Sequence, residues 1–124
     1  TRDITRPNES VANRVVGDVE GRVCILVDDM IDTAGTITKG ADAILAHGAA
    51  EVVVAATHAI LSGPAVDRLR ASAATEVVVT DTLPIPSDKR FEKLTVLPIA
   101  PLISRAITEV FADGSVTSLF DGRA

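Results

Sequence analysis

Several features that could point directly to a function are scarce in this chain of 124 residues. Its single cysteine excludes an internal disulfide and fits a reducing compartment. Aromatic residues make up 2%, with neither Trp nor Tyr, so there is no platform on which nucleic-acid bases could stack. The 12 basic side chains form no block and are outnumbered by 17 acidic ones, which argues against duplex nucleic acid as a partner. No apolar run approaches the length of a membrane span.

What remains is the composition of an ordinary globular domain. Hydrophobic residues make up 47% and charged residues 23%, which excludes a disordered chain. The length suits one domain rather than two. The chain begins with Thr1 rather than Met, so we expect it to be part of a longer protein. No signal peptide precedes the first predicted strand, and we expect a cytoplasmic location.

Two hydrophobic patterns alternate along the chain. Short apolar runs rich in β-branched residues predict buried strands over 23–27, 52–56, 76–80 and 94–97. Helical spacing predicts helices over 36–47, from Pro64 onward and over 100–111. Because strand–helix–strand units are right-handed crossovers, the sheet should be parallel. We therefore predict a doubly wound α/β domain over residues 21–124, with helices on both faces of a mainly parallel sheet, preceded by an arm over residues 1–20.

Three carboxylates lie directly after the first predicted strand. Asp28, Asp29 and Asp32 fall within five residues, and no Lys or Arg follows before Lys39. Ligands of open α/β sheets bind at the carboxyl ends of the strands. Since clustered like charges repel, a fold that keeps them there usually gives them a cation or hydroxyl groups to bind.

Small and hydroxyl-bearing residues follow, at the start of the first predicted helix. The segment 33–36 reads Thr-Ala-Gly-Thr. The free N–H groups of a helix start and the positive end of its dipole favour a bound phosphate. The segment as a whole suits a ligand with hydroxyls or a metal at one end and a phosphate at the other, such as a sugar phosphate.

Other interpretations of this segment are weaker. A strand ending in Asp-Asp also occurs in P-loop ATPases, but the chain contains no G-x-x-x-x-G-K-[ST] motif. Asp-Asp-x-x-Asp is also a metal site on the long helices of all-α enzymes, and this chain is not all-α. A purely structural role, with Asp32 and Thr33 as helix caps, stays open as the alternative.

The residues 27–36, Val-Asp-Asp-Met-Ile-Asp-Thr-Ala-Gly-Thr, resemble the phosphoribosyl pyrophosphate loop of type I phosphoribosyltransferases and ribose-phosphate pyrophosphokinases. The segments 56–65, 78–84 and 115–120 resemble the pyrophosphokinases in particular. A phosphoribosyltransferase would usually carry a hood for the acceptor base, and no such segment is present. The resemblance covers the carboxyl-terminal half of an enzyme normally built from two similar α/β domains, with a type I phosphoribosyltransferase-like fold.

The resemblance implies transfer of the diphosphate of Mg-ATP to the C1 hydroxyl of ribose 5-phosphate, which gives phosphoribosyl pyrophosphate and AMP. It implies that Asp28 and Asp29 face the ribose hydroxyls and bind Mg²⁺, the implied cofactor. The residues implied to bind ribose 5-phosphate are those two together with Asp32, Thr33, Ala34, Gly35 and Thr36.

Further implied roles lie near the two ends of the chain. Arg2 matches the arginine of the family's Lys-x-Arg catalytic arm, whose lysine would precede Thr1. Ser115, Thr117 and Phe120 fall where family members bind a regulatory phosphate or nucleotide between subunits. ATP would bind through an amino-terminal half that this sequence does not contain, and family members form homo-oligomers, namely hexamers. The isolated chain is therefore expected to be inactive, and the alternatives are a type I phosphoribosyltransferase or a non-catalytic regulatory homologue.

Three other residues have ordinary structural interpretations. Cys24 lies within a predicted strand and is expected to be a small core residue. His47 should complement the dipole at a helix end. His58 follows a strand at the predicted ligand edge, but no acid or metal-ligand spacing accompanies it, so a hydrogen-bonded loop histidine is the expected role.

Overall fold

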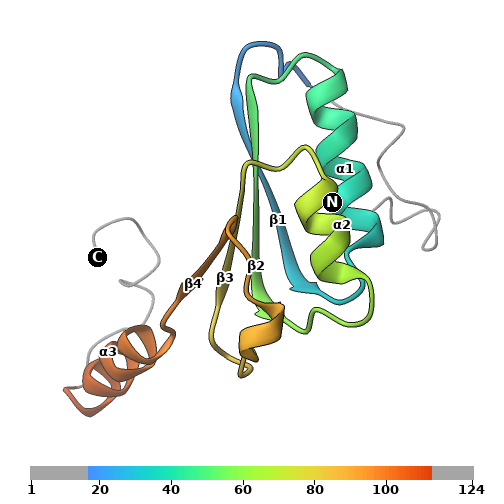
Figure 1. The fold of residues 1–124 in the computed structure, drawn as a ribbon. Coiled ribbons are helices and arrows are strands. Elements are labelled where there is room, and N and C mark those ends of the chain that lie inside the picture. The colour runs from blue at the N-terminus through green and yellow to red at the C-terminus, as the bar shows by residue number, and fades with distance from the viewer. Residues whose placement is uncertain (1–16, 113–124) are drawn as a thin grey trace, which may run out of the picture.

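A four-stranded parallel sheet forms the centre of the molecule. The computed structural model describes residues 17–112. The strands are β1 (Val23–Ile31), β2 (Glu51–Ala59), β3 (Glu76–Thr80) and β4 (Leu94–Leu97), in the spatial order β1-β2-β3-β4 (Figure 1). The helices are α1 (Gly35–Ala46), α2 (Ala65–Ala71) and α3 (Ala100–Phe111), with a short 3-10 turn over Ser87–Lys89. The predicted α/β class and the parallel sheet are confirmed.

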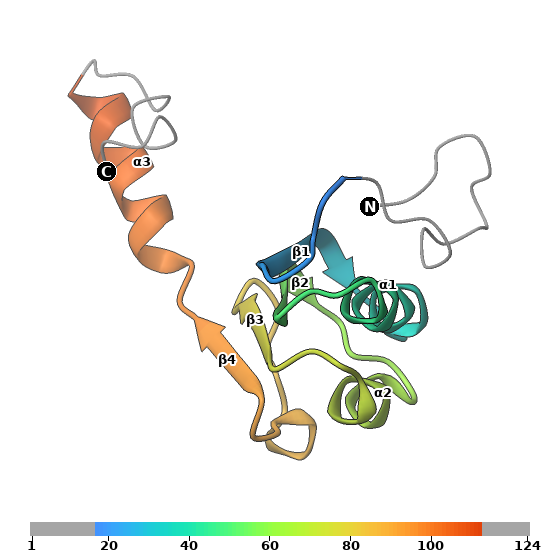
Figure 2. The same cartoon turned by 90° about the horizontal axis from the view of Figure 1, so that it is seen from above.

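The crossover helices α1 and α2 lie side by side on one face of the sheet (Figures 1 and 2). The core fills the space between these helices and the sheet, and its largest fully buried side chains are Ile31, Leu61, Leu69, Val52, Val54, Val77 and Val79. Gly40 allows α1 to pack closely on the sheet, since a Cβ there would lie 3.1 Å from Cδ2 of Leu26 on β1. This packing places the start of α1 at the carboxyl ends of the strands.

The opposite face of β1 is uncovered within residues 17–112. Val23, Ile25 and Val27 expose 62%, 65% and 61% of their surface. Helix α3 leads away beyond β4 and has no buried residue (Figure 2). Within this part of the chain, the packed helices α1 and α2 therefore cover one face of the sheet. The apolar run 23–27 indicates a strand, but nothing in the run itself shows what covers each face.

The first two strands are longer than their apolar runs predict. β1 continues through Asp28 and Asp29 to Ile31, and β2 continues to Ala59. Asp28 pairs with Ala56 and Ile31 with Ala59, so pairing continues beyond the apolar residues. Because the ladder is made by backbone groups, a polar side chain does not end it. The two aspartates are thus strand residues rather than loop residues. The predicted bounds of 76–80, 94–97 and 100–111 are confirmed.

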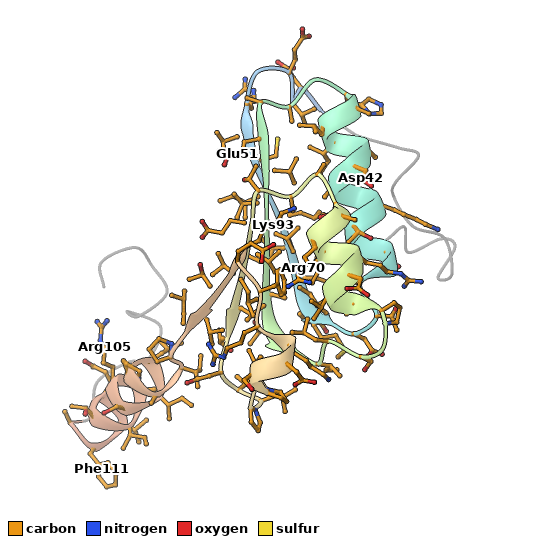
Figure 3. All side chains as sticks on the ribbon, in the orientation of Figure 1. Asp42, Glu51, Arg70, Lys93, Arg105 and Phe111 are labelled. Carbon is orange, nitrogen blue, oxygen red and sulfur yellow. The ribbon has the colours of Figure 1, made fainter. Side chains whose placement is uncertain are left out.

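Lys93 binds the carboxyl end of α2 through hydrogen bonds. Its Nζ donates to the carbonyl oxygens of Leu69 at 3.4 Å, Arg70 at 2.8 Å and Ser72 at 3.1 Å (Figure 3). The last carbonyl oxygens of a helix lack N–H partners in a following turn, and a cation at this end also complements the helix dipole. The Leu69 carbonyl additionally accepts from the N–H and the hydroxyl of Ser72, at 3.3 and 2.8 Å. The short helix α2 is therefore held in place from the loop that precedes β4.

Candidate phosphate-binding loop

The in–out alternation of side chains shifts at the carboxyl ends of β1 and β2. Through Asp28, every second residue of β1 is partly buried, but the next buried residue is Ile31, three positions later. β2 behaves in the same way, with Ala56 followed by Ala59. The shift occurs at paired positions of the two strands, since Asp28 pairs with Ala56 and Ile31 pairs with Ala59. The intervening residues of both strands, Asp29 among them, therefore lie at an accessible edge of the sheet.

The two strand aspartates differ in their surroundings. Asp28 is half-buried, and its Oδ1 accepts a hydrogen bond from the Asp29 N–H at 2.7 Å. Asp29 is exposed. Within residues 17–112, no group of three or more His, Cys, Asp or Glu side chains could hold a metal ion. Mg²⁺ commonly takes one or two carboxylates and completes its shell with water and substrate phosphates. The donor set at Asp28 and Asp29 fits that kind of shared ion, not a site built from protein alone.

Backbone hydrogen bonds tie the loop to the segment that follows β2. The Ile31 carbonyl accepts from the N–H groups of Ile60 and Leu61, each at 3.0 Å, and the Asp32 carbonyl accepts from Ser62 at 2.8 Å. Leu61 has φ +56° and Ala34 has φ +66°, both in the left-handed region. A non-glycine residue in that region costs roughly 1–3 kcal/mol. Such a conformation persists only where the surroundings hold it, and no residue pattern in the segment predicts it.

The start of α1 has no side-chain cap. Ala34 occupies the cap position, and no side chain of residues 17–112 bonds to the first N–H groups of the helix. The alternative that Asp32 and Thr33 act as helix caps is therefore wrong. Instead, the Thr38 hydroxyl donates to the Ala34 carbonyl at 2.6 Å. Among residues 17–112, the exposed side chains of Asp32, Thr33 and Thr36 form no internal hydrogen bond, so these hydroxyls and the helix N–H groups face water or a ligand.

Arg68 is a loop contact that the sequence did not reveal. This α2 residue lies 35 positions after Thr33, and its Nη1 donates to the Thr33 carbonyl at 3.2 Å. The same Nη1 would lie 3.0 Å from a Cβ placed on Gly35. In the sequence, Arg68 is one of several charged residues typical of a solvated helix face. Only the neighbouring positions of the two crossover helices bring it to the loop.

The histidines and Cys24 have structural surroundings. Nδ1 of His58 lies 2.8 Å from the Thr82 hydroxyl, which links the ends of β2 and β3. Nδ1 of His47 lies 2.8 Å from the Ala43 carbonyl at the end of α1, as expected for a residue at a helix end. Cys24 is half-buried and packs against the core, somewhat more exposed than expected.

Several predicted site residues cannot be placed. Arg2 and the first 16 residues of the arm predicted over 1–20, together with Ser115, Thr117 and Phe120, lie outside the described residues. In the described part of the chain, no helix is long and apolar enough to cross a membrane.

Comparison with known proteins extends the match beyond the loop. The family model of the phosphoribosyl synthetase-associated domain matches residues 4–121, almost the whole chain. The chain belongs to this family. Two relatives of this chain are named ribose-phosphate pyrophosphokinase. That of Bifidobacterium longum is 63% identical over 98% of this chain and 36% of its own length. That of Streptomyces avermitilis is 61% identical over 97% of this chain and 37% of its own length.

A solved structure supports the same family. Phosphoribosylpyrophosphate synthetase from Mycobacterium smegmatis is 56% identical in sequence and superposes with a TM-score of 0.74. The match covers 82% of this chain and 34% of that protein. The resemblance stated from the sequence is therefore confirmed. The chain spans little more than a third of the length of the relatives it matches.

Proposed function

We propose that this chain is the ribose 5-phosphate-binding domain of an enzyme that transfers the diphosphate of Mg-ATP to ribose 5-phosphate. The products would be phosphoribosyl pyrophosphate and AMP. The names of the relatives support this reaction, and they favour it over the alternative of a type I phosphoribosyltransferase. The observation that carries the binding role is the uncapped start of α1, with the free hydroxyls of Thr33 and Thr36 beside it.

The 5-phosphate would bind at the start of α1. Gly35 and Thr36 offer backbone N–H groups that no side chain in the described part of the chain caps, and Thr33 and Thr36 add hydroxyl donors. A dianionic phosphate gains from both kinds of donor and from the positive end of the helix dipole. Asp32 and Ala34 complete the proposed loop, with the turn at Ala34 setting its shape.

The sugar end of the ligand would meet the strand aspartates. Asp28 is held by its bond to the next backbone N–H, so its carboxylate keeps a fixed direction at the strand end. Asp28 and Asp29 would accept hydrogen bonds from the ribose hydroxyls and would hold Mg²⁺ jointly with the ligand. When bound, the ion would supply positive charge that offsets the diphosphate during transfer.

Other parts of the proposal rest on the family resemblance. Arg2 would stabilise the negative charge of the diphosphate in the transition state. Ser115, Thr117 and Phe120 would form part of a regulatory site between subunits of a homo-oligomer. ATP would be bound mainly by residues beyond this chain. We also propose a cytoplasmic location and a division at residue 20 between the arm and the α/β domain.

Calorimetric titration of ribose 5-phosphate tests the binding role. The Thr36→Val variant removes one hydroxyl while keeping the side-chain shape, and Thr95→Val makes the same change at an exposed position on β4. Loss of a hydrogen bond to a charged group is worth about 1.5–3 kcal/mol, so we expect roughly ten- to a hundredfold weaker binding for the first variant. The Thr95 variant should bind like the unaltered protein. Equal affinities for all three proteins would contradict the proposed phosphate site.

A further inference from the structure

Helix α2 contributes one cation to the loop, and it does so through the loop backbone. Nη1 of Arg68 donates to the Thr33 carbonyl at 3.2 Å. Thr33 directly precedes Ala34, whose left-handed φ of +66° turns the chain into α1. A guanidinium that holds the carbonyl at this point therefore restrains the turn that orients the first N–H groups of the helix.

Arg68 differs from the next arginine on the same helix. Nε of Arg70 lies 3.7 Å from Oε1 of Glu92, in an exposed ion pair. Within residues 17–112, Arg68 forms no such ion pair, and the Thr33 carbonyl is its hydrogen-bond partner. Since a guanidinium carries five N–H donors, Arg68 keeps its positive charge and most of its donors available beside the loop.

We propose that Arg68 is a positioning residue for the phosphate-binding loop. It holds the Thr33 carbonyl and, through it, the turn at Ala34, so that the N–H groups of Gly35 and Thr36 point away from the protein toward the phosphate. Its charge adds to the positive potential at the start of α1. This inference rests on the proposed function, since it names a residue that shapes the same site.

A substitution at Gly35 offers a second way to perturb the contact between Arg68 and the loop. Its φ is outside the left-handed region, so the backbone itself does not require glycine there. A Cβ would lie 3.0 Å from Nη1 of Arg68, the free end of a flexible side chain, which can move aside. Gly35→Ala should therefore displace the guanidinium while leaving the fold intact. On this account it acts through the same contact that Arg68→Met removes.

A double-mutant cycle on the full-length protein tests this coupling, with calorimetric titration of ribose 5-phosphate as the measurement. We expect Arg68→Met and Gly35→Ala each to weaken binding about three- to tenfold, which corresponds to one hydrogen bond of modest net strength. The double variant should be no weaker than the single ones, because both changes remove one contact. Arg70→Met, the matched control on the same helix, should bind like the unaltered protein. Effects that multiply in the double variant would overturn the inference.

Hydrogen–deuterium exchange of the ligand-free protein separates this inference from the proposed function. We expect faster exchange in a peptide over residues 31–37 for Arg68→Met and not for Arg70→Met, while a peptide over β3 stays unchanged as a control for folding. If ribose 5-phosphate fails to bind the unaltered protein but the exchange responds as expected, the proposed function is wrong and the positioning role stands. If the ligand binds and Arg68→Met alters neither affinity nor exchange, the positioning role is wrong.

Discussion

Replacement of Lys93 by Met should destabilise the domain by loosening α2 from the rest of the structure. The ammonium group donates to three carbonyl oxygens at the end of the helix, of which the bonds to Arg70 at 2.8 Å and Ser72 at 3.1 Å are short. The bond to Leu69 is longer, at 3.4 Å. Lys93 is only half-buried, so each short bond contributes about 1 kcal/mol net rather than the upper range for charged groups. Favourable interaction with the helix end adds about 0.5 kcal/mol.

The sum is a loss of about 2–3 kcal/mol in the free energy of unfolding, a large part of the roughly 5–15 kcal/mol typical of a domain. With a urea dependence of about 1–1.5 kcal/mol per molar for a domain of this size, the midpoint of urea unfolding should fall by roughly 2 M. Methionine keeps the apolar stem of lysine, so the change isolates the ammonium group. Lys39→Met on the exposed surface of α1 is the control and should leave the midpoint within about 0.3 M. Equal midpoints for the two variants would refute the assigned role of Lys93.

Three further outcomes are expected. Asp28→Asn should remove the Mg²⁺-dependent part of ribose 5-phosphate affinity, about ten- to a hundredfold, because the amide keeps a hydrogen-bonding oxygen but loses the charge that Mg²⁺ prefers. Calorimetric titration with and without Mg²⁺ measures this effect. An equal loss of affinity in both conditions would contradict it. The 124-residue chain by itself should self-associate through the uncovered face of β1. Ile25→Gln should reduce the self-association measured by light scattering at little cost in stability, since Ile25 is 65% exposed. A monomer of the unaltered chain at high concentration would count against this surface. The same chain by itself should form no AMP from ATP and ribose 5-phosphate, because it spans 36–38% of the length of its relatives; AMP above background would show that this part suffices.

The predictable part of the fold follows from side-chain patterns that are local in sequence. The strand over 76–80 and the helix over 100–111 have the predicted bounds because apolar periodicity reports local geometry directly. The extension of β1 through Asp28 and Asp29 could not be predicted in this way, since strand pairing is a property of the backbone. The exposure of one face of β1 could not be predicted either, because an apolar run does not show which elements cover it.

The candidate site also has a part that could be predicted from the sequence and a part that could not. The loop residues 28–36 are contiguous, so their chemistry is visible in the sequence and the family resemblance reinforces it. The left-handed turn at Ala34 and the contact from Arg68 depend on how two crossover helices pack. Arg68 is 35 positions from its partner, and an arginine on an exposed helix face is ordinary in any sequence. Contacts of this kind become visible only when the fold is known.

A crystal structure of the protein with ribose 5-phosphate bound tests the central claim most directly. We expect the phosphate group at the start of α1, with its oxygens within about 3.2 Å of the N–H groups of Gly35 and Thr36. The ribose hydroxyls should lie toward Asp28 and Asp29. A phosphate bound away from the start of α1, with residues 32–36 free of ligand contacts, would contradict the assignment of this loop.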